Sequence, residues 1–288
     1  MLVFRALSLL PLRALHAIGG ALGWVVYWAS PAYRRQLRTN LPPTLAQRDQ
    51  VLRRAVAESG KQVLELAWVW TRSGDQIRAC TRIEDAAGLE AILSQDRAVL
   101  MLTPHLGCFE IIAQNHAASA LGQRRPMLAL YRVPRKAALR PLFEQARAHQ
   151  GLLLAPADLH GVRLMLRALR DRQIVGLLPD QVPSRGEGIW APFFGRPAFT
   201  MTLPARLAHT HDAVVLLLFA RRLAHGAGFS IHWEPLEEAL CGQAVEDATR
   251  INRAMERLIL LCPEQYLWSY NRYKTPAGAP APPGGPAS

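Results

Sequence analysis

A histidine and a glutamate five residues apart, His105 and Glu110, are the side chains of this sequence best suited to chemistry. They lie in the segment Thr103-Pro104-His105-Leu106-Gly107-Cys108-Phe109-Glu110. An imidazole can take a proton from a hydroxyl, and a carboxylate that accepts a hydrogen bond from the ring can hold it in place. The pair therefore suits transfer of a group onto a hydroxyl.

The spacing alone does not identify a site, because it also occurs at His232 and Glu237. His232 lies in an alternating stretch, 229–233, that predicts an ordinary strand residue. By contrast, His105 directly follows an apolar run at 98–102. That run predicts a buried strand, the proline and glycine after it a tight turn, and the remainder the first turns of a helix.

Short apolar runs alternate with stretches of helical spacing along most of the chain. We expect strands at 97–103, 127–131, 152–154, 174–178, 214–219 and 229–233, and helices at 47–72, 107–121, 138–149, 161–170 and 249–261. This alternation predicts an α/β fold with a central, mostly parallel or mixed sheet flanked by helices.

Polar residues follow three of the expected strands. The segment 103–110 follows the first, Arg132 ends the second, and Asp180 and Gln181 close the fourth. Active sites of parallel α/β sheets gather at the carboxyl ends of the strands. We therefore expect Arg132 to bind a phosphate or an oxyanion, and Asp180, beside Gln181, to orient a substrate-binding arginine. The alternatives are a loop cap for Arg132 and a plain turn for Asp180.

Three further residues near these segments have possible roles. Backbone N–H groups around Gly107 are candidate donors to a developing oxyanion. Arg163 is a weaker candidate for substrate binding, because Arg167 and Arg170 on the same expected helix indicate a solvated basic face. We expect the thiol of Cys108 to act as a small buried hydrophobe rather than a nucleophile.

The sequence implies no metal and no cofactor. Its four cysteines are scattered without a C-x-x-C pair, which argues against a zinc site and a disulfide framework. The stretch His209-Thr210-His211-Asp212 imitates a metal site, but no third ligand cluster accompanies it in the sequence. We expect it to be the exposed end of a helix.

The chain carries a net charge of +12, from 31 arginines and three lysines against 22 acidic residues. Such a surplus predicts a polyanionic partner: an anionic membrane surface, a phosphorylated substrate, an acidic carrier protein or nucleic acid. Zinc-ligand spacing, an aromatic stacking motif and a Lys/Arg-dense tail are all missing from the sequence, which disfavours nucleic acid.

The first 30 residues predict a membrane anchor. Residues 7–29 are strongly apolar, but Arg13 and His16 interrupt them and leave 17–29 as the longest clean run. A helix of that length spans about 20 Å, less than the ~30 Å hydrocarbon core of a bilayer. Aromatic residues at its far end suit the interface and disfavour a cleaved signal peptide, and the basic stretch 33–38 suits anionic headgroups. We expect a tilted or partly inserted anchor.

Two downstream blocks carry a resemblance to a known family. The first runs through Leu178-Pro179-Asp180-Gln181-Val182-Pro183 to Pro192-Phe193-Phe194-Gly195. The second, C-terminal block is Pro263-Glu264-Gln265-Tyr266-Leu267-Trp268 followed by Arg272-Tyr273-Lys274. With the H-x4-E motif at His105, they resemble the late (lauroyl/myristoyl) acyltransferases of lipid A biosynthesis, within the lysophospholipid/glycerol-phosphate acyltransferase superfamily. The likeness extends from the apolar N-terminus to about Lys274. The chain lacks the Asn-His-x-Ser start and Phe-Pro-Glu-Gly-Thr block of the glycerol-phosphate branch.

The resemblance implies an enzyme of the inner membrane, peripheral or single-span, with its active site facing the cytoplasm. It would move an acyl chain from acyl carrier protein to a hydroxyl of a lipid A precursor. His105 would be the general base, and Glu110 would accept a hydrogen bond from the other ring nitrogen. Two alternatives stay open: a different lipid acceptor, such as a lysophospholipid or an aminolipid, and a catalytically inactive membrane-binding homologue.

The sequence thus divides into three parts. Residues 1–30 form the expected anchor and 31–275 a single acyltransferase domain, since a chain of this length can bury one large core. Residues 276–288 are rich in proline and glycine, and we expect them to be disordered.

Overall fold

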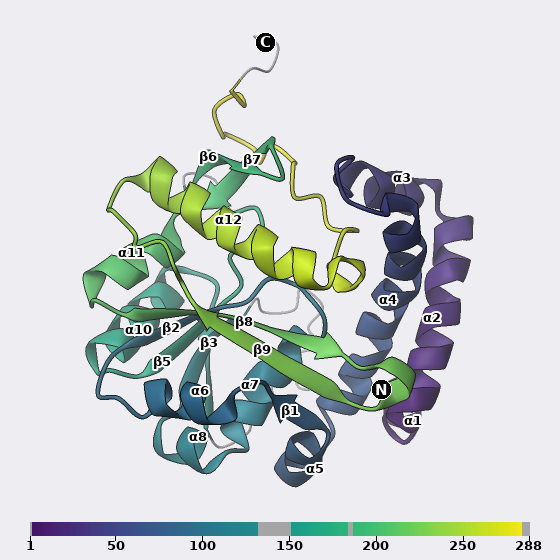
Figure 1. Ribbon diagram of the computed structural model, residues 1–288, viewed down its shortest axis with the longest axis horizontal. Helices are drawn as coiled ribbons and strands as arrows, with labels where there is room; N and C mark the ends of the chain where they lie inside the picture. The colour runs from purple at the N-terminus through teal and green to yellow at the C-terminus, as the bar shows by residue number, and fades with distance from the viewer. Residues whose placement is uncertain (1, 132–150, 184–186, 284–288) are drawn as a thin grey trace.

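A seven-stranded sheet forms the centre of the molecule (Figure 1). The computed structural model describes residues 2–131, 151–183 and 187–283. The strands of the sheet are β1 (Thr81–Ile83), β2 (Val99–Leu102), β3 (Met127–Tyr131), β4 (Leu152–Pro156), β5 (Ile174–Leu177), β8 (Val214–Arg222) and β9 (Phe229–Pro235). Their order is β1-β9-β8-β2-β5-β3-β4, and all neighbours are parallel except β8 and β9. The expected α/β architecture with a mostly parallel sheet is confirmed.

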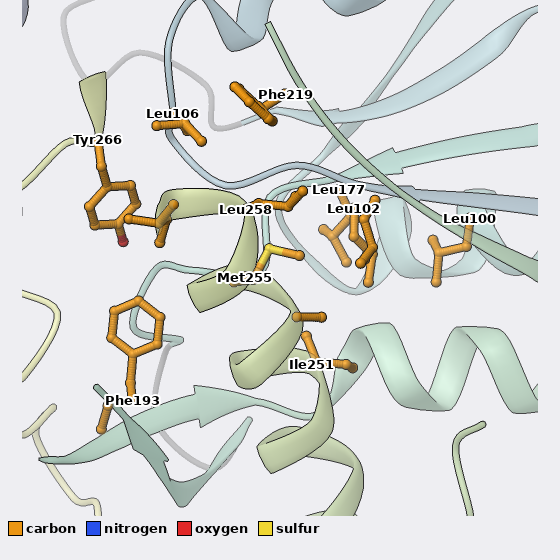
Figure 2. Packing of buried hydrophobic residues seen from close by; sticks show 14 of the residues in the cluster. Leu100, Leu102, Leu106, Leu177, Phe193, Phe219, Ile251, Met255, Leu258 and Tyr266 are labelled. Atoms are coloured by element: carbon orange, nitrogen blue, oxygen red, sulfur yellow. The ribbon is translucent and has the colours of Figure 1, made fainter. Parts of the chain in front are cut away.

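Helices cover both faces of the sheet. One face packs against α6 (Ala86–Leu93), α7 (Phe109–Ala117) and α8 (Ala120–Arg124), and the other against α10 (Leu159–Arg170), α11 (Leu203–Thr210) and α12 (Ala244–Leu261). Successive side chains of a strand point to opposite faces, so β2 contributes to two cores. Leu100 and Leu102 join the core under α10 and α12, whereas Val99 and Met101 join the one over α6 and α7. Figure 2 shows the first of these cores against α12.

Most of the expected elements are present, and the structure adds short elements that were not expected, among them β1 and α6. The helix expected at 107–121 is divided into α7 and α8, because the Ser119 hydroxyl accepts a hydrogen bond from the Gly122 N–H and begins a new helix. A hairpin of β6 (Gly188–Phe193) and β7 (Arg196–Met201) was not expected from the sequence. The helix expected at 138–149 lies outside the described residues.

The N-terminal segment forms α1 (Leu2–Ser8), α2 (Leu12–Ala29), α3 (Pro31–Asn40) and α4 (Arg48–Val69), followed by α5 (Gly74–Ala79). Helices α2 and α4 lie side by side at one edge of the molecule (Figure 1). Glycines let their backbones meet: a Cβ on Gly23 would lie 2.2 Å from the Val56 carbonyl oxygen, and one on Gly60 would lie 1.9 Å from the Gly19 carbonyl oxygen. Helix α2 is therefore packed closely onto α4.

The expected membrane anchor is not confirmed. Within the described part of the chain, no helix combines the length and the apolar character needed to cross a bilayer. His16, which interrupts the apolar run, is buried, and its Nε2 lies 3.0 Å from the Glu65 Oε2 on α4. The interruption thus faces protein, while Ile18, Leu22 and Val25 on the opposite side of α2 are exposed.

Candidate active site

The register of two neighbouring strands brings His105 next to Asp180. Strands β2 and β5 are parallel, with Leu102 opposite Leu177 at their carboxyl ends. His105 and Asp180 each lie three residues beyond that pair, so the two loops leave the sheet side by side. The Asp180 carboxylate accepts hydrogen bonds from His105 twice: Nδ1 lies 2.7 Å from Oδ1, and the backbone N–H donates to Oδ2 at 2.8 Å.

Each ring nitrogen of His105 has a partner. Since a carboxylate only accepts hydrogen bonds, the contact with Asp180 places the proton of the neutral ring on Nδ1. Nε2 then presents a lone pair, which the side-chain amide of Gln181 meets at 3.0 Å. The ring is 13% exposed and packs edge-on against Phe109, with 4.8 Å between ring centroids. This geometry, with one tautomer held by a carboxylate, suits a general base.

Asp180 is buried but remains ionised. Burial opposes its charge, but the contacts to His105 and the charge of Arg272 outweigh burial and lower the pKa of the carboxyl. Arg272 is itself 2% exposed and donates to the Phe199 carbonyl and the Thr200 hydroxyl. Burial, and then the charge of Asp180, raise the pKa of the nearby Tyr266 hydroxyl well above its ordinary value. The site therefore holds a carboxylate, a guanidinium and a neutral phenol close together.

Gly107 is required for a different reason from the one expected. Its N–H donates to the Gln265 carbonyl at 3.0 Å, so in this arrangement it is not directed at a substrate oxyanion. Its φ is +60°, and a Cβ there would lie 1.9 Å from the Ala220 carbonyl oxygen. The glycine thus permits a left-handed turn and a close backbone approach to β8.

Glu110 lies in the first turn of α7, half-buried. Its Oε2 accepts a hydrogen bond from the Trp70 indole at 3.3 Å. From the sequence, Glu110 was expected to contact a ring nitrogen of His105. In the structure, the carboxylate at Nδ1 is that of Asp180. The physical reason is the strand register, which brings the loop after β5 up against the ring.

The described residues do not support either of the two arginines expected to bind substrate. Arg132 lies outside them. Arg163 is exposed on α10, together with Arg167 and Arg170, as a solvated basic face would be. Asp180 was expected to orient a substrate-binding arginine. In the structure its hydrogen bonds go to His105, and the buried Arg272 adds an electrostatic interaction.

His209, His232 and Cys108, which the sequence analysis also considered, have ordinary environments. His209 lies at the exposed end of α11, with Nε2 2.9 Å from the buried Asp247 carboxylate, and His232 is a residue of β9. Among the described residues, no three His, Cys, Asp or Glu side chains are placed to hold a metal ion. Cys108 is buried, and burial raises the pKa of its thiol well above the ordinary value, as expected of a packing residue.

Three residues around the site were given no role from the sequence: Gln265, Arg272 and Arg222. Gln265 and Arg272 stand in the C-terminal block of the family resemblance, which was the available signal for both. Arg222 ends β8, and in the sequence it is one arginine among 31. The C-terminal block meets the His105 turn directly, since the Leu267 N–H donates to the His105 carbonyl at 3.0 Å and Leu106 pairs with Tyr266 (Figure 2).

Comparisons with known proteins point to one family. The family model for bacterial lipid A biosynthesis acyltransferases matches residues 1–275. The lipid A biosynthesis lauroyltransferase of Escherichia coli K12 is 25% identical over 229 residues, covering 77% of this chain and 71% of the relative. The palmitoleoyltransferase of the same strain is 26% identical and covers 80% and 71%. A lipid A biosynthesis acyltransferase of Haemophilus influenzae is 24% identical and covers 95% and 88%.

Proposed function

The chain belongs to the bacterial lipid A biosynthesis acyltransferase family, and from this premise we propose that it transfers a fatty acyl chain from acyl carrier protein to a hydroxyl of a lipid A precursor. The observation that carries the chemistry is the placement of His105 between Asp180 and Gln181 at the carboxyl ends of β2 and β5. The relatives named as lipid A lauroyl- and palmitoleoyltransferases support the acceptor.

In the proposed reaction, Nε2 of His105 takes the proton of the acceptor hydroxyl as its oxygen attacks the thioester carbonyl. The C–S bond then breaks, the ester forms, and the proton passes from the imidazolium to the departing thiolate. Asp180 fixes the Nδ1–H tautomer and stabilises the imidazolium. The Gln181 amide occupies the Nε2 lone pair in the resting site, so it must move aside for the hydroxyl. Once displaced from Nε2, the Gln181 amide would donate a hydrogen bond to the developing oxyanion.

Glu110 keeps a place in this proposal, one helical turn after the base. Its hydrogen bond with Trp70 connects the first turn of α7 to the C-terminal end of α4. We expect Glu110→Ala to lower transfer. Whether Glu110 or Asp180 orients the imidazole is decided by the variants described in the Discussion.

The test is an assay of the purified enzyme with acyl-carrier-protein thioesters of several chain lengths and two acceptors, a lipid A precursor and a lysophospholipid. We expect transfer to the lipid A precursor, and a loss of about 10²–10⁴-fold in turnover for His105→Ala. The matched control is His209→Ala, which removes another histidine that bonds to a buried carboxylate. Near wild-type turnover by His105→Ala would exclude the mechanism, and transfer to the lysophospholipid alone would exclude the acceptor.

We also propose that α2 lies against an anionic membrane surface rather than crossing it. Its outer side carries exposed Ile18, Leu22, Val25 and Trp28, and basic residues follow on α3. We expect Val25→Glu to reduce binding to vesicles containing phosphatidylglycerol, measured by flotation. Val245→Glu on α12 is the control, because the two valines are similarly exposed, 55% and 52%. Equal binding by the two variants would refute this orientation.

A further inference from the structure

The turn that carries His105 is fixed by backbone bonds to two distant segments. On one side the Cys108 N–H donates to the Ala220 carbonyl of β8 at 2.9 Å. On the other, the Gly107 N–H donates to the Gln265 carbonyl, and the Leu267 N–H donates to the His105 carbonyl, each at 3.0 Å. The position of the imidazole relative to the sheet therefore depends on where Gln265 and its neighbours are held.

The side chain of Gln265 ties this segment to the end of β8. It is buried, and both ends of its amide bond to the backbone of one residue, Arg222. Oε1 accepts from the Arg222 N–H at 2.8 Å, and Nε2 donates to the Arg222 carbonyl at 2.9 Å. One amide thus closes a bridge from β8 through η3 (Pro263–Gln265) to Gly107.

The side chain of Arg222 anchors the bridge in turn to α4. Its guanidinium forms two bonds to the Glu65 carboxylate, from Nε at 2.6 Å and Nη2 at 2.7 Å, and a third to Glu58 at 2.6 Å. Arg222 and Glu65 are both almost completely buried. A buried ion pair of this kind adds little net stability over apolar packing, but its bidentate geometry fixes the relative position of the two elements. On the same helix, Gln62 donates to the Gly107 carbonyl at 3.4 Å.

We propose that Gln265 is a positioning residue for His105, with Arg222 as its anchor on α4. This inference rests on the proposed role of His105 as the base. Gln265 touches no reacting group; it acts by holding the backbone of the turn, and displacement of a base by about 1 Å can cost about 10²-fold in rate. The expected signature is a fall in kcat with little change in KM, because the substrate sites are left in place.

The experiment compares Gln265→Leu with Asp247→Leu. Asp247 is also a buried side chain that binds two backbone N–H groups, those of Cys241 and Gly242, but it does so at the start of α12, away from the turn. We expect Gln265→Leu to lower kcat about 10- to 100-fold with KM within about threefold. Asp247→Leu should lower thermal stability by a comparable amount and keep kcat within about threefold. Equal kcat losses in the two variants, or none in folded Gln265→Leu, would overturn the proposal.

A second measurement separates this proposal from the proposed function. Hydrogen exchange of peptides covering residues 103–110 should become faster in Gln265→Leu and stay unchanged in Asp247→Leu, even if the enzyme transfers no acyl chain in the assay. Where Gln265→Leu does not fold, Gln265→Asn serves in its place, because it keeps the amide but withdraws it by one methylene from the Arg222 backbone. Unchanged exchange at the turn would refute the positioning role, whatever the activity.

Discussion

His105, the proposed base, and His16 make nearly the same contact in two parts of the molecule. Each has a ring nitrogen close to a buried carboxylate, 2.7 Å from Asp180 and 3.0 Å from Glu65. Around His105 the carboxylate binds the ring and the backbone N–H of the same residue, and the other ring nitrogen meets the side-chain amide of Gln181. Around His16 the carboxylate is already bound by Arg222 through two bonds, and the ring is buried between helices. A histidine–carboxylate contact therefore indicates a catalytic site only when the second nitrogen of the histidine ring can reach a substrate.

The largest expected effect concerns Asp180, the carboxylate that contacts His105. Asp180→Asn should lower turnover by about 10²–10⁴-fold. An amide cannot accept from both the Nδ1–H and the backbone N–H of His105, and it has no charge to stabilise the imidazolium. Glu65→Gln should lower turnover by less than about tenfold, since it acts only through the support of the turn. The measurement is kcat in the acyl transfer assay, with Glu110→Gln assayed in parallel. If Asp180→Asn keeps wild-type kcat and Glu110→Gln loses it, the orienting carboxylate is Glu110.

The next effect concerns stability toward acid on the side of His16. Burial opposes ionisation of Glu65, but Arg222 and then His16 outweigh it and lower the pKa of this carboxyl to about 2, from an ordinary value of 4.5. A depressed carboxyl pKa contributes stability that is fully present above pH 4.5 and is lost as the pH falls toward 2. The contribution is about 3 kcal/mol. Urea unfolding of wild type should weaken across this window, and Glu65→Gln should show a flatter dependence.

Glu90→Gln, which changes an exposed carboxylate on α6, is the control for that experiment. It should leave the acid dependence of the unfolding free energy as in wild type. Identical slopes for Glu65→Gln and wild type between pH 4.5 and 2 would contradict the assignment of this stability to the buried network.

The smallest expected effect concerns the packing of α2, the helix that carries His16, against α4. Gly23→Ala would place a Cβ 2.2 Å from the Val56 carbonyl oxygen, so α2 must shift away from α4. We expect a loss of about 1–3 kcal/mol in the free energy of unfolding. Gly20→Ala is the matched control on the same helix, because its Cβ would meet only side-chain atoms at 3.6 Å and 3.7 Å. It should be neutral or stabilising by up to about 1 kcal/mol, from helix propensity. Equal unfolding free energies for the two variants would contradict close packing of α2.

The sequence predicted the strand, turn and helix around His105 because each has a local signal: an apolar run, Pro104 and Gly107, and helical spacing. It did not predict the contact with Asp180, because strand order is not a local property. Strands β3 and β4 lie between β2 and β5 in the sequence, yet β2 and β5 are neighbours in the sheet. Once that order is known, counting from Leu102 and Leu177 gives the pair.

The same limit applies to Gly107 and His16. The position of Gly107 in a turn was predictable. The reason that a glycine is needed there was not, because it is the close approach of the Ala220 carbonyl, which is far away in the sequence. His16 was recognised as a break in an apolar run, and the break was interpreted as a limit on membrane insertion. Its partner Glu65 lies on another helix. His16, which interrupts the apolar run in the sequence, therefore makes a contact in the protein interior.

The hydrogen bonds from residues 265–267 to the His105 turn also set an order of events during protein synthesis. His105 leaves the ribosome long before the segment that holds its turn has been made. At about 5–20 residues per second, the roughly 160 residues between them take about 10–30 s to translate. During that interval the nascent chain carries the proposed base without the segment that holds its turn, so we expect no assembled site. Chains that terminate between residues 236 and 264 should be inactive, although every strand of the central sheet has been translated.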